Sequence, residues 1–457
     1  MLVIIALVCA SLWLAFFSGE WDYSVLRLIG DVDIHFKVDN VSRIFIVILD
    51  IAWICAGVYS FAYMGHEGKE ERFYIFYLLA YLALAGMDFS GNLVTMYMCF
   101  ELVTLTTFPL VLHSQTREAI MASLKYLLYS MCGAYMALFG IFILYRYAKS
   151  INFVPGGSMN LLAINQKPTV LLLAVFLMAV GFGVKCGMFP LHAWLTAAHP
   201  VAPSPASAVL SALIVKAGVL GIMRSVFYVA GVELIRGTWV QYAWMTLTLI
   251  TVFMGSMLAF REKIFKKRLA YSTVSQVSYI LFGFATLSET AIAGSLLHVI
   301  CHAVIKCGLF LIAGIFLSRL NIRKVDELTG IGKKMPAVLI SYTLLSLGLI
   351  GIPPTGGFIS KWYLAVGSLE ADGIGVYAWF GPMILLISAL LTAGYLLPIT
   401  MRGFLPGNTF NEDEVKKEEP PRAMLYPVAF LAILTVLLGV FPGYIIDYVS
   451  AIAAEIA

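Results

Sequence analysis

The sequence predicts an all-α polytopic membrane protein, with two inverted five-helix repeats, two broken helices and about thirteen spans of bilayer length. Of the 457 residues, 61% are apolar and 12% are charged, and the mean hydropathy is +0.91. Soluble domains contain far more charge. The apolar residues also lack the alternation that a membrane β-barrel requires. These observations exclude a soluble enzyme, a nucleic-acid-binding protein and a disordered chain.

Long apolar runs with few charges are the candidate spans. They cover residues 1–17, 42–64, 73–88, 91–112, 119–145, 170–190, 205–230, 240–260, 269–286, 290–318, 336–355, 379–401 and 424–446. The first run has no basic leader and no small-residue cleavage site, so we interpret it as a retained helix rather than a signal peptide. The seven cysteines form no CxxC pair and lie within or beside these runs. They are therefore expected to be small apolar fillers, without a disulfide framework or a metal cluster.

A faint internal repeat organises the spans. A shift of 171 residues (272 − 101) aligns CFELVTLTTF with AYSTVSQVSY, EAIMASLKYLLYSMCGAYM with ETAIAGSLLHVICHAVIKC, and VKCGMFPLHAW with TGGFISKWYLA. The shift contains an odd number of spans, so the second copy should be inverted, as in many transporters. The predicted parts are three N-terminal helices at 1–90, the first repeat and the start of the second at 91–260, the second repeat at 261–402, and a cytoplasmic loop with the last helix at 403–457.

Lysine and arginine are concentrated in alternate loops, most strongly between Arg261 and Arg268. Positive charge favours the cytoplasmic side, so the N-terminus should be cytoplasmic and the C-terminus outside, in a prokaryotic cell membrane. The polar stretch at 407–422 is expected to be a solvated cytoplasmic loop. We identify no second soluble domain, so this chain should hold no cofactor or metal, and any redox centre should belong to other chains.

Ionisable residues inside the apolar runs are the strongest functional signal, because charge is costly in lipid. Among them are Glu101, Lys125, Lys185, Lys216, His298, His302 and Lys306, and Lys361 follows the second break. The spacing of four places His298, His302 and Lys306 on one helical face, about 6 Å apart at each step. A series of amines and imidazoles at mid-depth indicates a path for protons, since neutral histidine can both accept and donate one.

Two interruptions rich in glycine and proline accompany these charges. GFGVKCGMFPLHAW places Lys185 among glycines before Pro190, and SLGLIGIPPTGGFISKW places Lys361 after two prolines and two glycines. Proline removes a backbone donor and glycine loosens the helix, so both segments should be broken within the membrane. The carbonyls that each break frees then need water or polar partners.

At this point the chain resembles an antiporter-like membrane subunit of the respiratory complex I superfamily, which includes Mrp-type cation/proton antiporters and membrane-bound hydrogenases. The matching motifs are FELVTLTTFPLV, VKCGMFPLHAWLTAAHPVAPSPASAVLSALIVKAGVLGIMR, KKRLAYSTVSQVSYILFG, LLHVICHAVIKCGLFLIAG and GIPPTGGFISKWYL. The lysine at the second break is similar to that of the complex I subunit nearest the redox arm and of the Mrp D subunit.

The resemblance implies roles for single residues. It implies that Glu101 pairs with Lys185 and that Lys216 is the bridging lysine. It further implies that His298, His302 and Lys306 are central and that Lys361 is terminal. Lys125 and His192 are accessory candidates.

The sequence also departs from the family pattern. Only one span precedes DNVSRIF at 39–45, so the first family helix is expected to be missing, and no lateral helix follows the last span. Gln276 stands where a histidine is common, so a relay there would need water or Ser275. Asp50 has no family role; it is either a locally hydrogen-bonded aspartate or part of a cation path. Sodium ligands could come from Asp50, Ser275 and Thr273.

The function predicted is proton translocation, with sodium as the alternative ion, by an antiporter-like subunit of a redox-driven complex. A Glu101 that approaches and leaves Lys185 would switch this lysine between holding and releasing a proton. The alternative is a subunit of an Mrp-type Na⁺/H⁺ antiporter without redox chemistry; a structural subunit with a vestigial channel is a third. We find no nucleotide loop or catalytic triad, so an active site of its own is disfavoured. Expected partners are further membrane subunits, iron–sulfur subunits if redox-driven, the lipid bilayer, and H⁺ or Na⁺, without nucleic acid.

Overall fold

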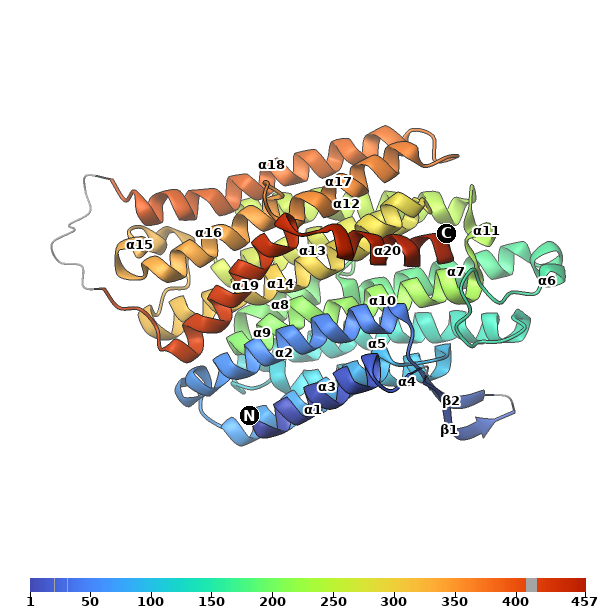
Figure 1. The fold of residues 1–457 in the computed structure, drawn as a ribbon, viewed down its shortest axis with the longest axis horizontal. Coiled ribbons are helices and arrows are strands. Elements are labelled where there is room, and N and C mark those ends of the chain that lie inside the picture. The colour runs from blue at the N-terminus through green and yellow to red at the C-terminus, as the bar shows by residue number, and fades with distance from the viewer. Residues whose placement is uncertain (20, 31, 408–416) are drawn as a thin grey trace.

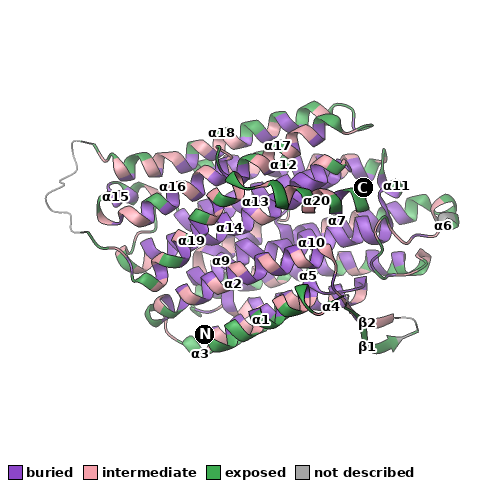
Figure 2. Cartoon of the chain, viewed as in Figure 1, coloured by how far each residue is buried: buried purple, intermediate pink, exposed green. Residues whose placement is uncertain are grey.

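The computed structural model describes residues 1–457 except 20, 31 and 408–416. The described part is a bundle of helices that run along the long axis, with one β-hairpin projecting at one end (Figure 1). Buried residues line the middle of the bundle, and exposed residues follow its outer helices (Figure 2). Most of the loop predicted at 407–422 lies outside the described residues.

The elements follow one another with short connections. They are α1 (Leu2–Phe16), β1 (Asp22–Ile29), β2 (Val32–Lys37), α2 (Asn40–Glu67), α3 (Glu70–Asp88), α4 (Leu93–Val111), α5 (Arg117–Tyr147), α6 (Leu161–Gln166), α7 (Pro168–Cys186), α8 (Ala193–Val201), α9 (Ser204–Val209), η1 (Leu210–Ile214), α10 (Val215–Ser225), η2 (Val226–Ala230), α11 (Val232–Ile235), α12 (Trp239–Arg261), α13 (Phe265–Ala285), α14 (Glu289–Leu320), η3 (Val325–Leu328), α15 (Ile331–Lys334), α16 (Pro336–Ile350), α17 (Gly356–Glu370), α18 (Tyr377–Phe404), α19 (Arg422–Val440) and α20 (Gly443–Ile456).

Within the described residues, nine helical segments are long and apolar enough to cross a membrane, and α1 and α16 are shorter apolar helices. The nine are α2, α4, α5, α7, the continuous segment Ser204–Ala230, α12, α14, α18 and α19. This finding confirms the predicted class, a polytopic helical membrane protein.

The β-hairpin corrects the prediction of an all-α chain. Strands β1 and β2 pair antiparallel, with Asp22 opposite Lys37 and Ile29 opposite Val32. The hairpin is tied to the bundle, because the Lys37 amide donates to the Phe89 carbonyl oxygen at 2.7 Å. These residues follow α1 directly and are too polar to continue the span, so the chain folds back on itself outside the helices.

Both predicted helix breaks are present. Helix α7 ends at Cys186 and α8 begins at Ala193, while α16 ends at Ile350 and α17 begins at Gly356. A third interruption, which the sequence analysis missed, separates α19 from α20 at Phe441 and Pro442. Proline has no backbone N–H to donate and disfavours helical geometry in the residue before it, so the run predicted at 424–446 does not remain one helix.

Small residues let the helices around the first break approach closely. A Cβ added to Gly181 of α7 would lie 2.5 Å from the Gly133 carbonyl oxygen of α5, and a Cβ on Gly218 of α10 would lie 2.5 Å from the Phe182 carbonyl oxygen. Close backbone approach at small residues is a common way to pack helices in membranes. Helix α7 is thereby held between α5 and α10, and this places its last turn in the core.

Candidate functional site

Lys185 lies in the last turn of α7 and is 1% exposed. Its Nζ donates to Thr104 Oγ1 of α4 at 2.7 Å, to Tyr126 OH of α5 at 2.8 Å and to Ser130 Oγ of α5 at 3.5 Å. The amine also lies 4.7 Å from the centre of the Tyr126 ring. Three hydroxyls and an aromatic face can solvate a buried ammonium group without fixing its charge.

Glu101 of α4 is partly buried and accepts a hydrogen bond from Tyr97 OH at 3.1 Å. Among the described residues there is no ion pair within 4.0 Å between Glu101 and Lys185. The ion pair between Glu101 and Lys185 that the family resemblance implies is therefore not formed in this structure. Thr104, which follows Glu101 by one turn of α4, receives the lysine instead.

Lys216 lies in α10 directly after the π-helical segment η1 and is 1% exposed. Its Nζ donates to the Ser211 carbonyl oxygen at 2.9 Å and lies 2.5 Å from His302 Nδ1 of α14. Segments of π-helix are frequent at functional sites. Here the wider turn directs the amine across to α14, so the bridging lysine and the central histidine are in direct contact.

The central residues of α14 form one face. The rings of His298 and His302 lie 6.0 Å apart between centroids, and His298 Nδ1 is 2.9 Å from Ser360 Oγ of α17. Lys306 Nζ donates to Ser272 Oγ of α13 at 2.7 Å. All three residues are at most 2% exposed. The structure therefore brings together the three residues that the sequence spacing placed on one face.

Lys361 of α17 closes the series. Its Nζ donates to the carbonyl oxygens of Leu349 at 2.6 Å and Ile350 at 2.9 Å, at the end of α16. The same amine lies 5.1 Å from the centre of the Tyr279 ring, which stacks on His298 at 5.6 Å. Tyr279 of α13 thus connects the histidines to the terminal lysine, a link that the sequence analysis did not name.

Helix α13 lines this face with Ser272, Gln276 and Tyr279, one turn apart. Gln276 is fully buried, and neither of its amide atoms has a hydrogen-bond partner in the described part of the chain. Since Ser272 contacts Lys306 and Tyr279 contacts His298, Gln276 lies at the level of His302 between them. The Nε2 atoms of both histidines also have no partner among the residues described. Such buried polar atoms are costly and are found where a protein handles water or protons.

Ser275 does not join this face. Its hydroxyl contacts Ser256 Oγ of α12 at 2.8 Å and Ser388 Oγ of α18 at 3.2 Å. One residue along a helix turns the side chain by about 100°, so Ser275 and Gln276 point to different neighbours. Thr273 instead lies 2.7 Å from Ser211 Oγ, close to the bridging lysine.

The remaining accessory candidates lie apart from the series. Lys125 is partly buried, 5.9 Å from the centre of the Tyr129 ring, and lines an open groove on the side of α5. The His192 ring is 5.8 Å from that of Phe189 in the first break. Asp50 accepts hydrogen bonds from Ser11 at 2.9 Å and Tyr81 at 2.6 Å, which favours the locally hydrogen-bonded aspartate over a cation path.

One buried ion pair was missed by the sequence analysis. Arg224 of α10 is 1% exposed and donates to both carboxylate oxygens of Asp39, at 2.6 and 2.8 Å. Burial alone would raise the pKa of Asp39, which caps α2, but the Arg224 charge and its hydrogen bonds lower it to about 2. The sequence signal for this pair was Arg224 itself, a charged residue inside the apolar run 205–230. This ion pair joins α10 to α2.

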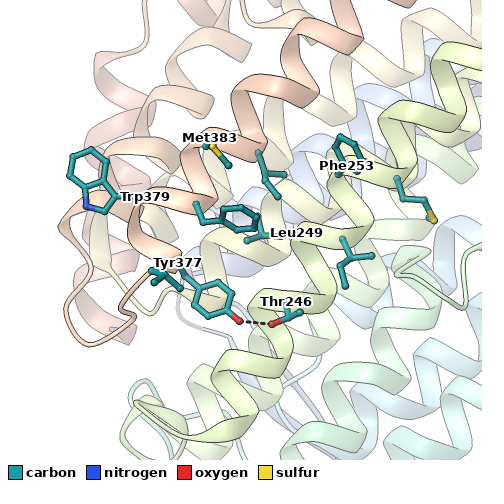
Figure 3. A pocket seen from close by; sticks show the side chains of 11 residues that line it. Thr246, Leu249, Phe253, Tyr377, Trp379 and Met383 are labelled. Atoms are coloured by element: carbon teal, nitrogen blue, oxygen red, sulfur yellow. Dashed lines mark hydrogen bonds between the residues drawn. The ribbon is translucent and has the colours of Figure 1, made fainter.

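The outer surface carries an apolar groove away from the buried ionisable residues. It lies between α12 and α18 and is lined almost entirely by carbon, including Leu249, Phe253 and Met383 (Figure 3). Its polar feature is a hydrogen bond of 2.7 Å between Thr246 Oγ1 and Tyr377 OH. Among the residues that line this groove there is no carboxylate, amine or imidazole.

The fold and the buried residues define a class: a polytopic membrane protein with a series of ionisable side chains in its core. Residues 90–400 match the family described as NADH:quinone oxidoreductase/Mrp antiporter, transmembrane. The chain belongs to this family and is an antiporter-like subunit of the complex I, Mrp and hydrogenase superfamily.

Relatives and a solved structure agree with this assignment. The chain is 34% identical over 445 residues to NADH-quinone oxidoreductase subunit N of Desulforudis audaxviator, covering 94% of this chain and 87% of the relative. It is 28% identical over 420 residues to the D subunit of a Na(+)/H(+) antiporter of Bacillus subtilis, covering 91% and 82%. Its fold matches a chain of the Mrp complex from Dietzia sp. with a TM-score of 0.85 at 20% identity, covering 99% of this chain and 91% of the other.

Proposed function

We propose that this chain translocates protons as the antiporter-like subunit of a redox-driven membrane complex related to complex I or membrane-bound hydrogenase. The observation that carries the proposal is the buried succession of contacts from Lys216 through His302, His298 and Tyr279 to Lys361. Each member except Tyr279 exchanges a proton readily, and the phenol can relay one. The relative named as a quinone oxidoreductase subunit supports the redox-driven reading.

The first step concerns Glu101 and Lys185. With the glutamate closer, a protonated Lys185 would be stabilised; here Glu101 accepts a hydrogen bond from Tyr97, and the hydrogen bonds of the Lys185 amine go to hydroxyls of α4 and α5. A nearby opposite charge favours the protonated form of an amine, and withdrawing that charge in a low-dielectric site disfavours it. Movement of Glu101 away from Lys185 therefore releases the proton.

The released proton moves to Lys216, on the helix packed against α7. Cys186, which follows Lys185, donates to the carbonyl oxygen of Val215, which precedes Lys216, at 3.6 Å. The two lysines are therefore each next in sequence to a residue of this contact. From Lys216 the proton passes to His302 Nδ1, and the ring can release another from Nε2 toward Gln276, His298 or Lys306. Lys361 is the last amine before the opposite surface.

The membrane arrangement proposed has thirteen spans, in which α7 with α8, α9 through η2, α16 with α17, and α19 with α20 each cross together. The first inverted repeat and the start of the second would lie within residues 91–260, and the second repeat within 261–402. The N-terminus would be cytoplasmic and the C-terminus outside. The neighbours would be further membrane subunits, with iron–sulfur subunits in other chains and no cofactor in this one.

The second candidate is a subunit of an Mrp-type Na⁺/H⁺ antiporter driven by an existing gradient. The Bacillus subtilis relative, named as part of a Na(+)/H(+) antiporter, favours it. The same residues would serve, because both candidates need a proton path. The genes beside this one discriminate: hydrogenase-like and iron–sulfur subunits support the first candidate, and small antiporter subunits alone support the second.

The test uses the purified complex in vesicles, with proton uptake measured with and without sodium. Lys185→Ala and Glu101→Ala should each abolish coupled transport while the complex still assembles. Lys167→Ala is the control, since Lys167 is exposed and lies at the opposite end of α7. Full pumping by Lys185→Ala vesicles would refute the role of that lysine, and full pumping by both variants would leave only a structural subunit.

A further inference from the structure

His199 is a buried histidine that the path described above does not use. It lies in the last turn of α8, is 0% exposed, and stacks on Phe310 of α14 at 4.4 Å between ring centroids. Neither ring nitrogen has a hydrogen-bond partner among the described residues. By contrast, the buried imidazole of His113 bonds the Gly68 carbonyl oxygen at 3.0 Å. Leaving a buried polar atom unbonded costs about 1–3 kcal/mol, so this ring needs an explanation beyond packing.

The charges around His199 connect it to two regions. The cations that act on its ring are Lys266 and Lys306. Lys306 belongs to the central series on α14. Lys266 is the second residue of α13, is 7% exposed, and donates to the Ala202 carbonyl oxygen just beyond α8 at 3.0 Å. The contacts agree: the His199 ring stacks on Phe310, one turn of α14 from Lys306, and Ala202, which accepts from Lys266, follows His199 by three residues.

The outer end of this line reaches the surface through Glu67. Glu67 ends α2, is partly exposed, accepts a hydrogen bond from Tyr63 OH at 2.8 Å, and acts on Lys266 as a nearby opposite charge. Burial increases inward, from Glu67 through Lys266 to His199. This is the end of the bundle opposite the β-hairpin (Figure 1). No step of the proposed path through Lys185 uses these residues.

We propose that Glu67, Lys266 and His199 form an inlet branch that brings protons from the aqueous phase at this end directly to Lys306. The branch rests on the proposed proton translocation: it supplies protons to Lys306, while the switch between Glu101 and Lys185 still couples their movement to the driving reaction. A proton bound by Lys266 passes to one nitrogen of the His199 ring, and the proton on the other nitrogen passes to a neutral Lys306. The ring ends in its other tautomer, ready to be reset, and no other reactant is needed.

The experiment measures proton uptake by the complex in vesicles over a range of pH at the side of the α2–α3 connection. His199→Phe keeps the stacking on Phe310 and removes both nitrogens. We expect its rate to be near that of the unmodified complex at low pH and about 10-fold lower at high pH, where protons are scarce and the relay limits. Lys266→Met should show the same pH-dependent loss. His113→Gln, at the same end of the bundle, is the control and should match the unmodified complex.

The outcomes separate this proposal from the proposed function. No proton transport by the unmodified complex would overturn the proposed function itself. Transport by His199→Phe that equals the unmodified complex at every pH would overturn the branch alone, and so would a loss equal at every pH, which indicates a structural role. If His199→Phe fails to assemble, Lys266→Met decides, because its side chain lies nearer the surface.

Discussion

The break between α7 and α8 and the break between α16 and α17 both place a lysine beside glycine and proline, yet the two lysines have different partners. At the first break, Lys185 precedes the interruption and donates to hydroxyls of other helices. At the second break, Lys361 follows the interruption and donates to the carbonyl oxygens at the end of α16. The first lysine is therefore free of the backbone, whereas the second stabilises it.

The difference follows from what else satisfies the freed carbonyls. The Val184 carbonyl oxygen near the end of α7 accepts from the Trp194 indole at 2.8 Å and from the Gly187 amide at 3.0 Å. At the end of α16 the carbonyl oxygens accept hydrogen bonds from Lys361. This lysine lies near a helix C-terminus, where the helix dipole favours positive charge. At the first break, therefore, the lysine and the free carbonyl oxygens have different partners. At the second break, the lysine itself is the partner of the carbonyl oxygens.

The largest expected effect is that of Lys361→Met. It leaves the Leu349 and Ile350 carbonyls without this donor, at about 1–3 kcal/mol for each. Lys185→Met should cost less stability, because Tyr126 OH keeps a contact of 2.7 Å with Thr107. Apparent thermal midpoints of the detergent-purified complex, at one scan rate, compare the two. Equal midpoints would remove the distinction between the breaks, and Lys361→Arg should recover much of the loss.

Gly357→Ala tests the packing of the second break. A Cβ at Gly357 of α17 would overlap the Gly348 carbonyl oxygen of α16, so the helices must separate, at about 1–3 kcal/mol or more. At the first break Gly187 has a φ of +75°, and its added Cβ would lie 3.3 Å from Val274 Cγ2. Gly187→Ala should therefore cost mainly the left-handed backbone strain, about 1–2 kcal/mol. The same thermal assay should rank Gly357→Ala as the less stable; the reverse order would contradict this account.

The smallest expected effect is that of Trp194→Phe. It removes the indole donor to the Val184 carbonyl oxygen, which keeps the Gly187 amide as a partner. The expected loss of stability is about 1 kcal/mol, with proton transport largely retained. A loss as large as that of Lys361→Met would show that the first break depends on one donor as strongly as the second does. Trp244→Phe is a suitable control, because the Trp244 indole nitrogen has no partner among the described residues.

The sequence by itself determined the class of fold, both Lys-bearing breaks and the buried ionisable residues of the central series. Membrane insertion depends on local composition. A run of about twenty apolar residues, or a lysine within it, can therefore be recognised without knowing which helices pack around it. The periodicity of one helix also placed His298, His302 and Lys306 together, because a spacing of four is a property of the helix alone.

Only the tertiary structure decided which groups meet across helices. The contact of Lys216 with His302 and the pair of Arg224 with Asp39 join residues far apart in the chain, and the separation of Glu101 from Lys185 is a matter of packing. The rotation of each helix about its axis sets such contacts, and a turn of about 100° per residue sends Ser275 and Gln276 to different neighbours. That rotation is fixed by the packing of all helices together, at contacts such as Gly181 against Gly133, which hydropathy does not encode.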